Sequence, residues 1–255
     1  MEIRGKTIIV TGAASGIGRA SAVAFAQAGC ARLYLVDVND AGLAETATLC
    51  ADGACKATTH VLDLADIPAT ETWFKRNGAV DILYNNAGIV SGEPQFPDVD
   101  AAAIQRIIDI NFTSMVVATQ ETAAYMKARG GGVIVNTIST VALGTGFYDP
   151  MYAASKAGAM MFTRCCASLE QSHGVRVVGV LPGLVRTPIV DTTGANGKSQ
   201  WMRDVLAANE ACEPSEIADA VVILVQDGAI AGGDWVAVSR VDGSVVHRWG
   251  HQEPA

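Results

Sequence analysis

Short apolar segments alternate with longer amphipathic ones along this chain. The short segments are rich in Val, Ile and Leu without polar alternation, which is typical of strands buried on both faces of a parallel sheet. They cover residues 7–10, 32–36, 58–62, 82–84, 133–138, 175–181 and 235–238. The amphipathic segments predict helices at about 16–28, 41–51, 67–77, 100–129, 150–173 and 214–226. This alternation predicts one α/β domain over residues 1–255, a Rossmann-type doubly wound parallel sheet of about seven strands with helices on both faces.

Two segments do not follow the alternation. Residues 183–213 contain Pro188, Gly194 and Gly197 and form the longest irregular stretch. A loop of this length within a compact domain is usually functional, so we expect a substrate lid there. Residues 244–255 are expected to form a polar C-terminal tail.

The composition limits the kinds of partner. The chain has 255 residues, half of them hydrophobic, and its 18 Lys and Arg against 26 Asp and Glu give a formal net charge of −8. Without a basic run, this balance argues against nucleic acid or an anionic membrane as the main partner. No apolar run has the length of a membrane span, and no apolar segment precedes the first predicted strand. We therefore predict a cytoplasmic protein without a signal peptide.

The metal-binding residue types form no recognisable site. The six cysteines contain no Cys-x-x-Cys pair, so free thiols in a reducing compartment are expected. They are Cys30, Cys50, Cys55, Cys165, Cys166 and Cys212. His247 and His251 have a spacing that suits a metal, but no carboxylate–histidine cluster surrounds them in the sequence. No metal site is predicted.

The most informative chemical pattern joins Ser139, Tyr152 and Lys156. Tyr152 follows Ser139 by thirteen residues, and Lys156 follows Tyr152 by four. Positions four apart share one face of a helix, so the phenol and the ammonium are predicted to face the same space. A nearby positive charge favours the phenolate and lowers the phenol pKa, and such a tyrosine can act as a general acid or base. The pattern predicts proton chemistry on an oxygen atom.

A glycine-rich turn, TGAASGIG at 11–18, links the first predicted strand to the first helix. Its glycines let the backbone approach a pyrophosphate at the helix N-terminus. Asp37 ends the second predicted strand, where a carboxylate accepts hydrogen bonds from ribose hydroxyls and repels a 2′-phosphate. Neither Ser15 nor Val38 supplies a compensating cation, and Arg19 is expected on the exposed side of its helix. NAD is therefore favoured over NADP.

With these residues in place, the chain resembles the short-chain dehydrogenase/reductase family over nearly its whole length. The matching motifs are TGAASGIG at 11–18, Asp63-Leu64 after the third strand, NNAG at 85–88, Asn111, Ser139, YAASK at 152–156, and Pro182-Gly183 with Thr187 beyond. Each motif alone is modest, whereas seven in the right order and spacing are specific.

The resemblance implies roles for individual residues. Tyr152 would be the catalytic acid/base, Lys156 would hold the nicotinamide ribose and lower the tyrosine pKa, and Ser139 would hydrogen-bond the substrate oxygen. Asn111 would hold a water that links Lys156 to bulk solvent, and Asp63 would bind the adenine amino group. The implied cofactor residues are Gly12, Ser15, Gly16, Ile17, Gly18, Asp37, Val38, Asp63, Leu64, Asn86, Ala87, Gly88, Tyr152, Lys156, Pro182, Val185 and Thr187.

The candidate substrate wall is mostly apolar. Its members are Ser139, Leu143, Phe147, Leu184, Ile189, Trp201 and Met202. Their character favours an apolar or aromatic alcohol or ketone. Tyr148 competes with Tyr152 but has no lysine four residues on, so it is expected at the pocket wall or the surface. No Arg or Lys is obviously placed to clamp a substrate carboxylate, and Arg186 suits the cofactor pyrophosphate or the surface equally well.

The second long helix predicts self-association. Members of the family commonly pair the helices that here carry Asn111 and Tyr152 across a dyad. The Tyr152 helix has more apolar positions than one core-facing stripe needs: Met160, Met161, Phe162, Cys165, Cys166 and Leu169. A second buried face, and hence a homodimer or homotetramer, is predicted.

Together these features predict an NAD-dependent oxidoreductase that interconverts a secondary alcohol and a ketone, with hydride transfer to or from nicotinamide. Epimerase or dehydratase chemistry on a nucleotide sugar is an alternative, but such relatives usually carry a longer C-terminal substrate domain. Enoyl reductases of related fold space tyrosine and lysine differently. The alternative outside enzymes is a nucleotide-sensing or scaffold protein, which would not need both Tyr152 and Lys156.

Overall fold

The centre of the molecule is an eight-stranded sheet in the order β3-β2-β1-β4-β5-β6-β7-β8. The computed structural model describes residues 1–51, 55–93, 96–144, 148–194 and 196–252. The strands are β1 (Thr7–Thr11), β2 (Arg32–Asp37), β3 (Lys56–Val61), β4 (Ile82–Asn85), β5 (Gly132–Thr137), β6 (Val175–Pro182), β7 (Trp235–Val241) and β8 (Ser244–Trp249). Strands β1 to β7 pair in parallel, which confirms the predicted doubly wound sheet.

The eighth strand corrects the prediction of a polar tail from Ser244 onward. β8 pairs antiparallel with β7 along its whole length. Asp242 and Gly243 connect the two strands with φ angles of 49° and 75°. Asp-Gly with positive φ at both positions is a preferred two-residue hairpin connection. This dipeptide is the sequence signal that distinguishes a hairpin from a tail.

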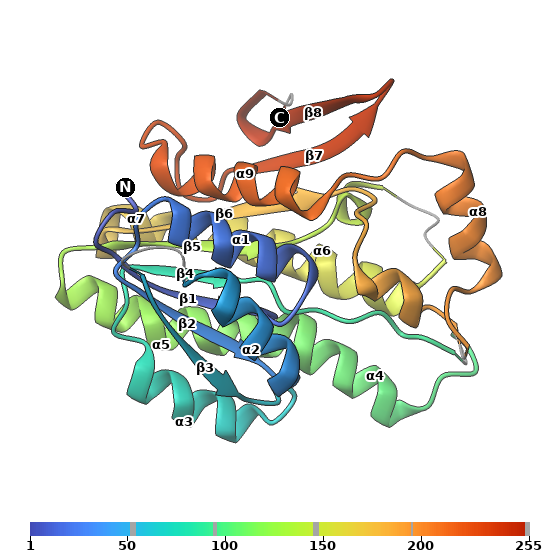
Figure 1. The fold of residues 1–255 in the computed structure, drawn as a ribbon, viewed down its shortest axis with the longest axis horizontal. Coiled ribbons are helices and arrows are strands. Elements are labelled where there is room, and N and C mark those ends of the chain that lie inside the picture. The colour runs from blue at the N-terminus through green and yellow to red at the C-terminus, as the bar shows by residue number, and fades with distance from the viewer. Residues whose placement is uncertain (52–54, 94–95, 145–147, 195, 253–255) are drawn as a thin grey trace.

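Helices cover both faces of the sheet (Figure 1). One face carries α1 (Gly16–Gln27), α2 (Asp40–Leu49) and α9 (Pro214–Gln226), and the other carries α3 (Ile67–Asn77), α5 (Ser114–Ala128), α6 (Pro150–Cys165) and α7 (Ser168–His173). Successive side chains of a strand point to opposite layers: in β1, Ile8 and Val10 belong to one apolar cluster and Ile9 belongs to another. Burial on both faces explains why the strands appear as continuous apolar runs in the sequence.

Both long predicted helices are interrupted. The first consists of α4 (Ala101–Ile108), a π-helical turn η1 (Asp109–Thr113) and α5. The second consists of α6 and the short α7. The π-helical turn contains Asn111, and such turns occur frequently at functional sites.

The predicted lid contains two helical segments among its described residues. It contains the 3₁₀ turn η3 (Pro188–Thr192) and the helix α8 (Gln200–Ala208). Its two ends are joined by a parallel bridge between Val185 and Cys212. In Figure 1 this segment lies beyond the ends of the strands, next to the loops that follow them.

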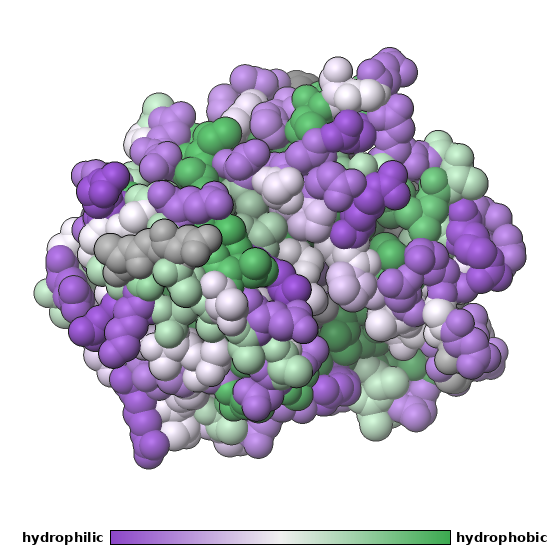
Figure 2. Space-filling model, in the orientation of Figure 1, coloured by the Kyte–Doolittle hydropathy of each residue, from purple (hydrophilic) through white to green (hydrophobic). Residues whose placement is uncertain are grey.

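Polar residues cover most of the face seen in Figure 2, and apolar residues appear there in small groups. One helical run, Ala101–Ala128, has the length and mean hydropathy, 1.2, of a membrane-spanning helix. Core helices of globular domains have the same composition, and α5 packs on the sheet through buried Met115, Ala118 and Met126. The six cysteines are free thiols, of which Cys165 is exposed.

Candidate active site

A cleft of about 810 Å³ opens at the carboxyl edge of the sheet, between the strand ends and the lid. Ligands of doubly wound sheets bind at this edge, because the loops that follow the strands converge there. Thirteen of the predicted cofactor residues line the cleft: Gly12, Ser15, Gly16, Ile17, Asp37, Asn86, Ala87, Gly88, Tyr152, Lys156, Pro182, Val185 and Thr187. The other four, Gly18, Val38, Asp63 and Leu64, are not among its lining residues.

Close packing requires glycine in the turn after β1. A Cβ atom on Gly18 would lie 2.1 Å from the carbonyl oxygen of Gly12, so no larger residue fits without moving the turn. Ser15 stands at the N-cap of α1 and makes no side-chain capping bond with the described residues. The first N–H groups of α1 are thus left without a side-chain acceptor, which fits an anionic group at this helix end.

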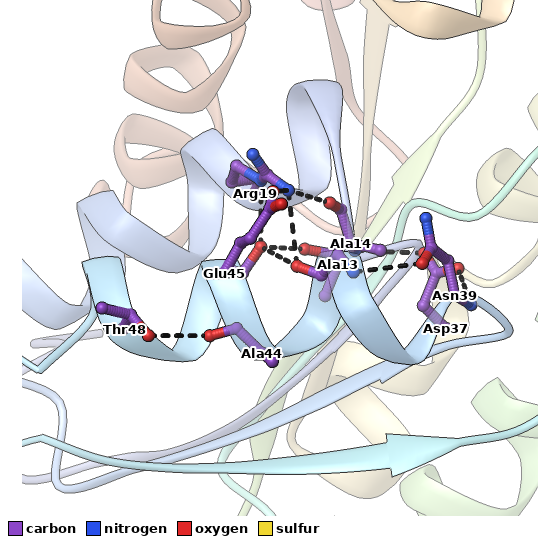
Figure 3. A network of polar contacts seen from close by, with 10 residues as sticks. Ala13, Ala14, Arg19, Asp37, Asn39, Ala44, Glu45 and Thr48 are labelled. Carbon is purple, nitrogen blue, oxygen red and sulfur yellow. Dashed lines mark hydrogen bonds and ion pairs between the residues drawn. The ribbon is translucent and has the colours of Figure 1, made fainter.

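Asp37 is fixed at the end of β2 by backbone donors (Figure 3). One carboxylate oxygen accepts from the Ala14 N–H at 3.1 Å, and the other accepts from the Asn39 N–H at 3.0 Å. Val38 beside it is 61% exposed and is not among the residues that line the cleft. The carboxylate therefore places a fixed negative charge at one end of the cleft.

Arg19 is not the simply exposed side chain that the sequence suggests. Its guanidinium bridges α1 to α2, donating to the Ala14 carbonyl at 2.5 Å and to the Thr46 hydroxyl at 3.0 Å. It also forms an ion pair with Glu45 at 2.7 Å (Figure 3). The positive charge of Arg19 is therefore already paired with the Glu45 carboxylate.

Asp63 and Leu64 belong to the structure around the cleft. Asp63 accepts from the Ala65 N–H at 3.0 Å and pairs with Arg106 of α4 at 3.1 Å. Burial by itself raises the pKa of Asp63, but the Ala65 bond and the Arg106 guanidinium outweigh it and hold this pKa below its ordinary value. Leu64 is buried in the apolar cluster beneath α3 and α5. The carboxylate that the resemblance assigns to adenine is thus engaged by Arg106.

Ser139, Tyr152 and Lys156 come together in the cleft, as the sequence spacing predicts. Ser139 precedes the 3₁₀ turn η2 (Thr140–Leu143), and its side chain hydrogen-bonds the Tyr152 phenol. The Lys156 Nζ lies 5.7 Å from the centroid of the Tyr152 ring and donates to the Thr137 carbonyl oxygen at 3.0 Å. The end of β5, the residue Ser139 that follows it and the helix α6 therefore fix the phenol, the hydroxyl and the ammonium around one space.

Burial governs the titration of this pair. It raises the pKa of Tyr152 to about 12. The hydrogen bond from Ser139 lowers this pKa, and the negative charge of Asp149 raises it further. Burial also lowers the pKa of Lys156 to about 8. The prediction of a lowered Tyr152 pKa is therefore wrong for the residues of this chain. Desolvation of the phenolate raises the pKa by more than the Ser139 hydrogen bond lowers it.

Asn111 connects the loop after β4 to the helix that carries Tyr152. Its Oδ1 accepts from the Ile89 N–H at 2.8 Å, and its Nδ2 donates to the Ile89 carbonyl at 2.9 Å and the Ser155 hydroxyl at 3.0 Å. Asn111 does not line the cleft but lines a small second pocket of about 10 Å³, together with Thr137. That volume is close to the minimum needed for one water molecule.

The NNAG motif holds the strand ends together. Asn86 donates from its backbone N–H to the Thr11 hydroxyl at 2.9 Å and from its side chain to the Thr11 carbonyl at 3.1 Å. Asn85 is buried and donates to the Asn136 side chain at 2.9 Å. The motif thus fixes β1, β4 and β5 relative to one another at the floor of the cleft.

The predicted substrate residues divide into two groups. Ser139, Leu184, Ile189 and Met202 line the cleft. Leu143 is 39% exposed and lies outside the lining, and Phe147 falls outside the described residues. Trp201 contributes indirectly, because its ring stacks on Tyr148 with centroids 5.6 Å apart, and Tyr148 lines the cleft. Tyr148 is thus a wall residue.

The lid end and β7 supply lining residues that were not predicted, namely Asn209, Glu210, Ser239, Arg240 and Val241. Arg240 is a basic residue at the cleft that the sequence did not indicate. It pairs with Glu216 and donates to the Gly243 carbonyl at 3.1 Å. Because β7 is a parallel strand, its end lies at the edge of the sheet where the cleft opens, and this could have indicated Ser239, Arg240 and Val241.

The described residues contain no group of three or more His, Cys, Asp and Glu side chains suited to a metal ion. His251 instead pairs with Asp234 at 2.5 Å.

The family model for short chain dehydrogenases matches residues 6–198. The chain is 32% identical to cis-4-hydroxycyclohexanecarboxylate dehydrogenase of Sinomonas cyclohexanicum over 93% of its own length and 95% of that protein. It is 30% identical to levodione reductase of Leifsonia aquatica over 88% of each chain.

Among solved structures, the chain is similar to a candidate NAD(P)-dependent gluconate 5-dehydrogenase from Beutenbergia cavernae, which has NADP bound at low occupancy. The TM-score is 0.83 and the identity 30%, over 93% of this chain and 97% of that one. The match of the family model, the full-length relatives and the arrangement of the cleft lead to one assignment. The chain belongs to the short-chain dehydrogenase/reductase family of oxidoreductases, whose members bind a nicotinamide cofactor.

Proposed function

We propose that this protein catalyses the NAD(H)-dependent interconversion of a secondary alcohol and a ketone. The observation that carries the proposal is the convergence of Ser139, Tyr152 and Lys156 in the cleft that also contains the glycine turn. A nucleotide sensor or scaffold needs the turn, but it has no need of a buried lysine beside a half-buried tyrosine. A buried ammonium is costly, so its presence beside the phenol favours catalysis.

The residues of the cleft fit a dinucleotide. The open N-terminus of α1 suits the pyrophosphate, Asp37 suits the adenosine ribose, and Lys156 suits the nicotinamide ribose. Pro182, Val185 and Thr187 line the cleft next to the lid and would seat the nicotinamide end. A bound nicotinamide supplies the hydride acceptor or donor and, when oxidised, a positive charge beside the phenol.

Tyr152 is proposed as the general acid/base. In alcohol oxidation its phenolate takes the proton of the substrate hydroxyl, and in ketone reduction the phenol returns a proton to the carbonyl oxygen. Ser139 hydrogen-bonds the phenol and is placed to hold the same substrate oxygen. Because burial disfavours the phenolate, the Lys156 ammonium has to supply part of the positive charge that stabilises it.

Asn111 and Lys156 provide a route for the proton. Lys156 donates to the Thr137 carbonyl, and Thr137 and Asn111 both line the small pocket of about 10 Å³. One water in that pocket would have hydroxyl and amide partners around it. We propose that this water, held beside Asn111, connects Lys156 to solvent.

NAD is the proposed cofactor in preference to NADP. Asp37 places a carboxylate where a 2′-phosphate would be repelled, and the Arg19 charge is matched by Glu45. The similar protein from Beutenbergia cavernae is described as NAD(P)-dependent and has NADP bound, so the proposed preference for NAD rests on the side chains at the end of β2 and not on the fold.

The substrate is proposed to be an apolar cyclic alcohol or ketone. Leu184, Ile189, Met202 and the Tyr148 ring give the cleft an apolar wall. The name of one relative, cis-4-hydroxycyclohexanecarboxylate dehydrogenase, supports a ring alcohol, with a carboxylate as an additional group on that relative's substrate.

The proposed assembly is a homodimer or homotetramer through the helices that carry Asn111 and Tyr152. Only 33% of the most apolar window of Ala101–Ala128 is buried, and Met161 of α6 is 57% exposed. Apolar helix faces of this kind are usually covered by a partner. We also propose that the protein is cytoplasmic.

The test is nicotinamide absorbance with a panel of secondary alcohols and ketones, for the wild type, Tyr152→Phe and Tyr148→Phe. We expect turnover with NAD(H), a loss of about 100-fold or more in kcat/KM for Tyr152→Phe, and a smaller change for the wall residue Tyr148. Turnover that survives Tyr152→Phe but not Tyr148→Phe would overturn the assignment. Nucleotide binding without any turnover would favour the sensor or scaffold.

A further inference from the structure

Asp149 is a buried carboxylate three residues before Tyr152, and it is 1% exposed. Its Oδ1 accepts from the Tyr152 N–H at 3.0 Å and from the Ser91 hydroxyl at 2.6 Å. Its Oδ2 accepts from the Ser91 N–H at 2.7 Å. Among the described residues, its partners are two N–H groups and one hydroxyl, without a cation. Burying a carboxylate without a cation is costly, so three good hydrogen bonds are needed to keep it there.

The same loop is held at a second point. Asn111 hydrogen-bonds both the N–H and the carbonyl of Ile89, two residues before Ser91, and donates to the Ser155 hydroxyl. The Ser155 hydroxyl in turn donates to the Tyr152 carbonyl at 2.7 Å. Both polar backbone groups of Tyr152 are thus engaged, the N–H by Asp149 and the carbonyl by Ser155.

This arrangement has a direct consequence for the cleft. Ile89 and Val90 line it opposite α6, and Tyr152 projects into it from α6. The loop after β4 and the start of α6 come from distant parts of the chain, and the bonds of Asp149 to Ser91 join them directly. A catalytic group misplaced by about 1 Å can lose two orders of magnitude in rate.

We propose that Asp149 is a positioning residue, which fixes the Tyr152 helix against the loop after β4. The inference rests on the proposed function, because it assigns Tyr152 the acid/base role. The groups that act on the phenol are Ser139 from η2, Lys156 from α6 itself and Asp149 from the α6 N-cap. Burial is the main cause of the raised pKa of Tyr152, and the negative charge of Asp149 raises this pKa further.

Three variants separate position from charge. Asp149→Ala removes both, Asp149→Asn keeps an oxygen for the Tyr152 N–H while removing the charge, and Ser91→Ala removes only the hydroxyl bond. We expect kcat to fall about tenfold or more in Asp149→Ala with little change in the cofactor Kd, and to recover partly in Asp149→Asn. A kcat within twofold of wild type for Asp149→Ala would overturn the positioning role.

The charge is tested by the pH profile and by direct titration. In the oxidation direction the active form is the phenolate, so kcat/KM rises with pH through the Tyr152 pKa, and Asp149→Asn should move this rise to lower pH. The phenolate absorbance of each protein minus that of its Tyr152→Phe counterpart gives the same titration without turnover. An unchanged titration in Asp149→Asn would overturn the charge effect.

A readout independent of catalysis distinguishes this inference from the proposed function. We expect the amides of Ser91 and Tyr152 to exchange with deuterium faster in Asp149→Ala than in wild type, while the core of β1 stays unchanged. Faster exchange in a protein without any turnover would leave the positioning role standing and overturn only the proposed function. Unchanged exchange in an active enzyme would overturn the positioning role and leave the proposed function standing.

Discussion

The ammonium of Lys156 lies 5.7 Å from the centroid of the Tyr152 ring, and the Thr137 carbonyl at the end of β5 holds it there. Lys156 is 2% exposed, so a positive charge is kept in a place that disfavours charge. Burial of the Lys156 ammonium therefore lowers the stability of the fold at the site where the proposed catalysis needs a fixed cation.

Replacement of Lys156 by Met should reveal this cost through its pH dependence. The pKa of Lys156 falls from 10.5 to about 8 on folding, so between these values the unfolded chain binds more protons than the folded one. The free energy of unfolding of the wild type should therefore rise with pH relative to Lys156→Met across this range. Urea denaturation of both proteins below pH 8 and near pH 10 measures the difference, and a difference independent of pH would contradict the buried ammonium.

Asp37→Ala should shift the cofactor preference towards NADP. Removing the carboxylate removes the repulsion of a 2′-phosphate, so the ratio of NADP to NAD affinity should rise about tenfold or more. Adding Glu45→Gln should raise it further, because Arg19 then loses the carboxylate that matches its charge. Fluorescence titrations with both reduced cofactors measure the ratio. Equal affinities in the unmodified protein would refute the preference itself.

Gly18→Ala should abolish cofactor binding and destabilise the fold by about 1–3 kcal/mol, because the added methyl group overlaps the Gly12 carbonyl. Gly228→Ala is the matched control, since a Cβ there meets nothing within 4 Å. Thermal unfolding with and without NADH provides the comparison. Equal behaviour of the two variants would show that the turn has room for a side chain.

Met161→Glu should dissociate the proposed oligomer. Met161 is 57% exposed on α6, and a charge placed in an apolar interface costs several kcal/mol unless it is paired. Val61→Glu, at a residue 59% exposed on the edge strand β3, is the control. Light scattering at micromolar concentration reads the mass of each protein. A wild type that is monomeric there would remove the basis for the prediction.

Local patterns in the sequence predict much of this molecule, and the exceptions have physical causes. The parallel strands are recognisable because burial on both faces makes them continuous apolar runs. β8 was predicted as a tail because its six residues, Ser244–Trp249, are largely exposed and carry no such run. The π-helical turn at Asn111 has no local signal, since it depends on the bonds of that side chain to Ile89.

The chain by itself determined the order of strands and helices, the glycine turn and the four-residue spacing that places Tyr152 and Lys156 on one helix face. These are local properties, set by backbone geometry and side-chain periodicity. The tertiary structure decided that Arg19 is matched by Glu45 and that Asp63 faces Arg106. It also decided that Arg240 reaches the cleft and that burial raises the Tyr152 pKa. Charge pairing and desolvation depend on residues that are distant in sequence and meet only when the sheet and its layers are assembled.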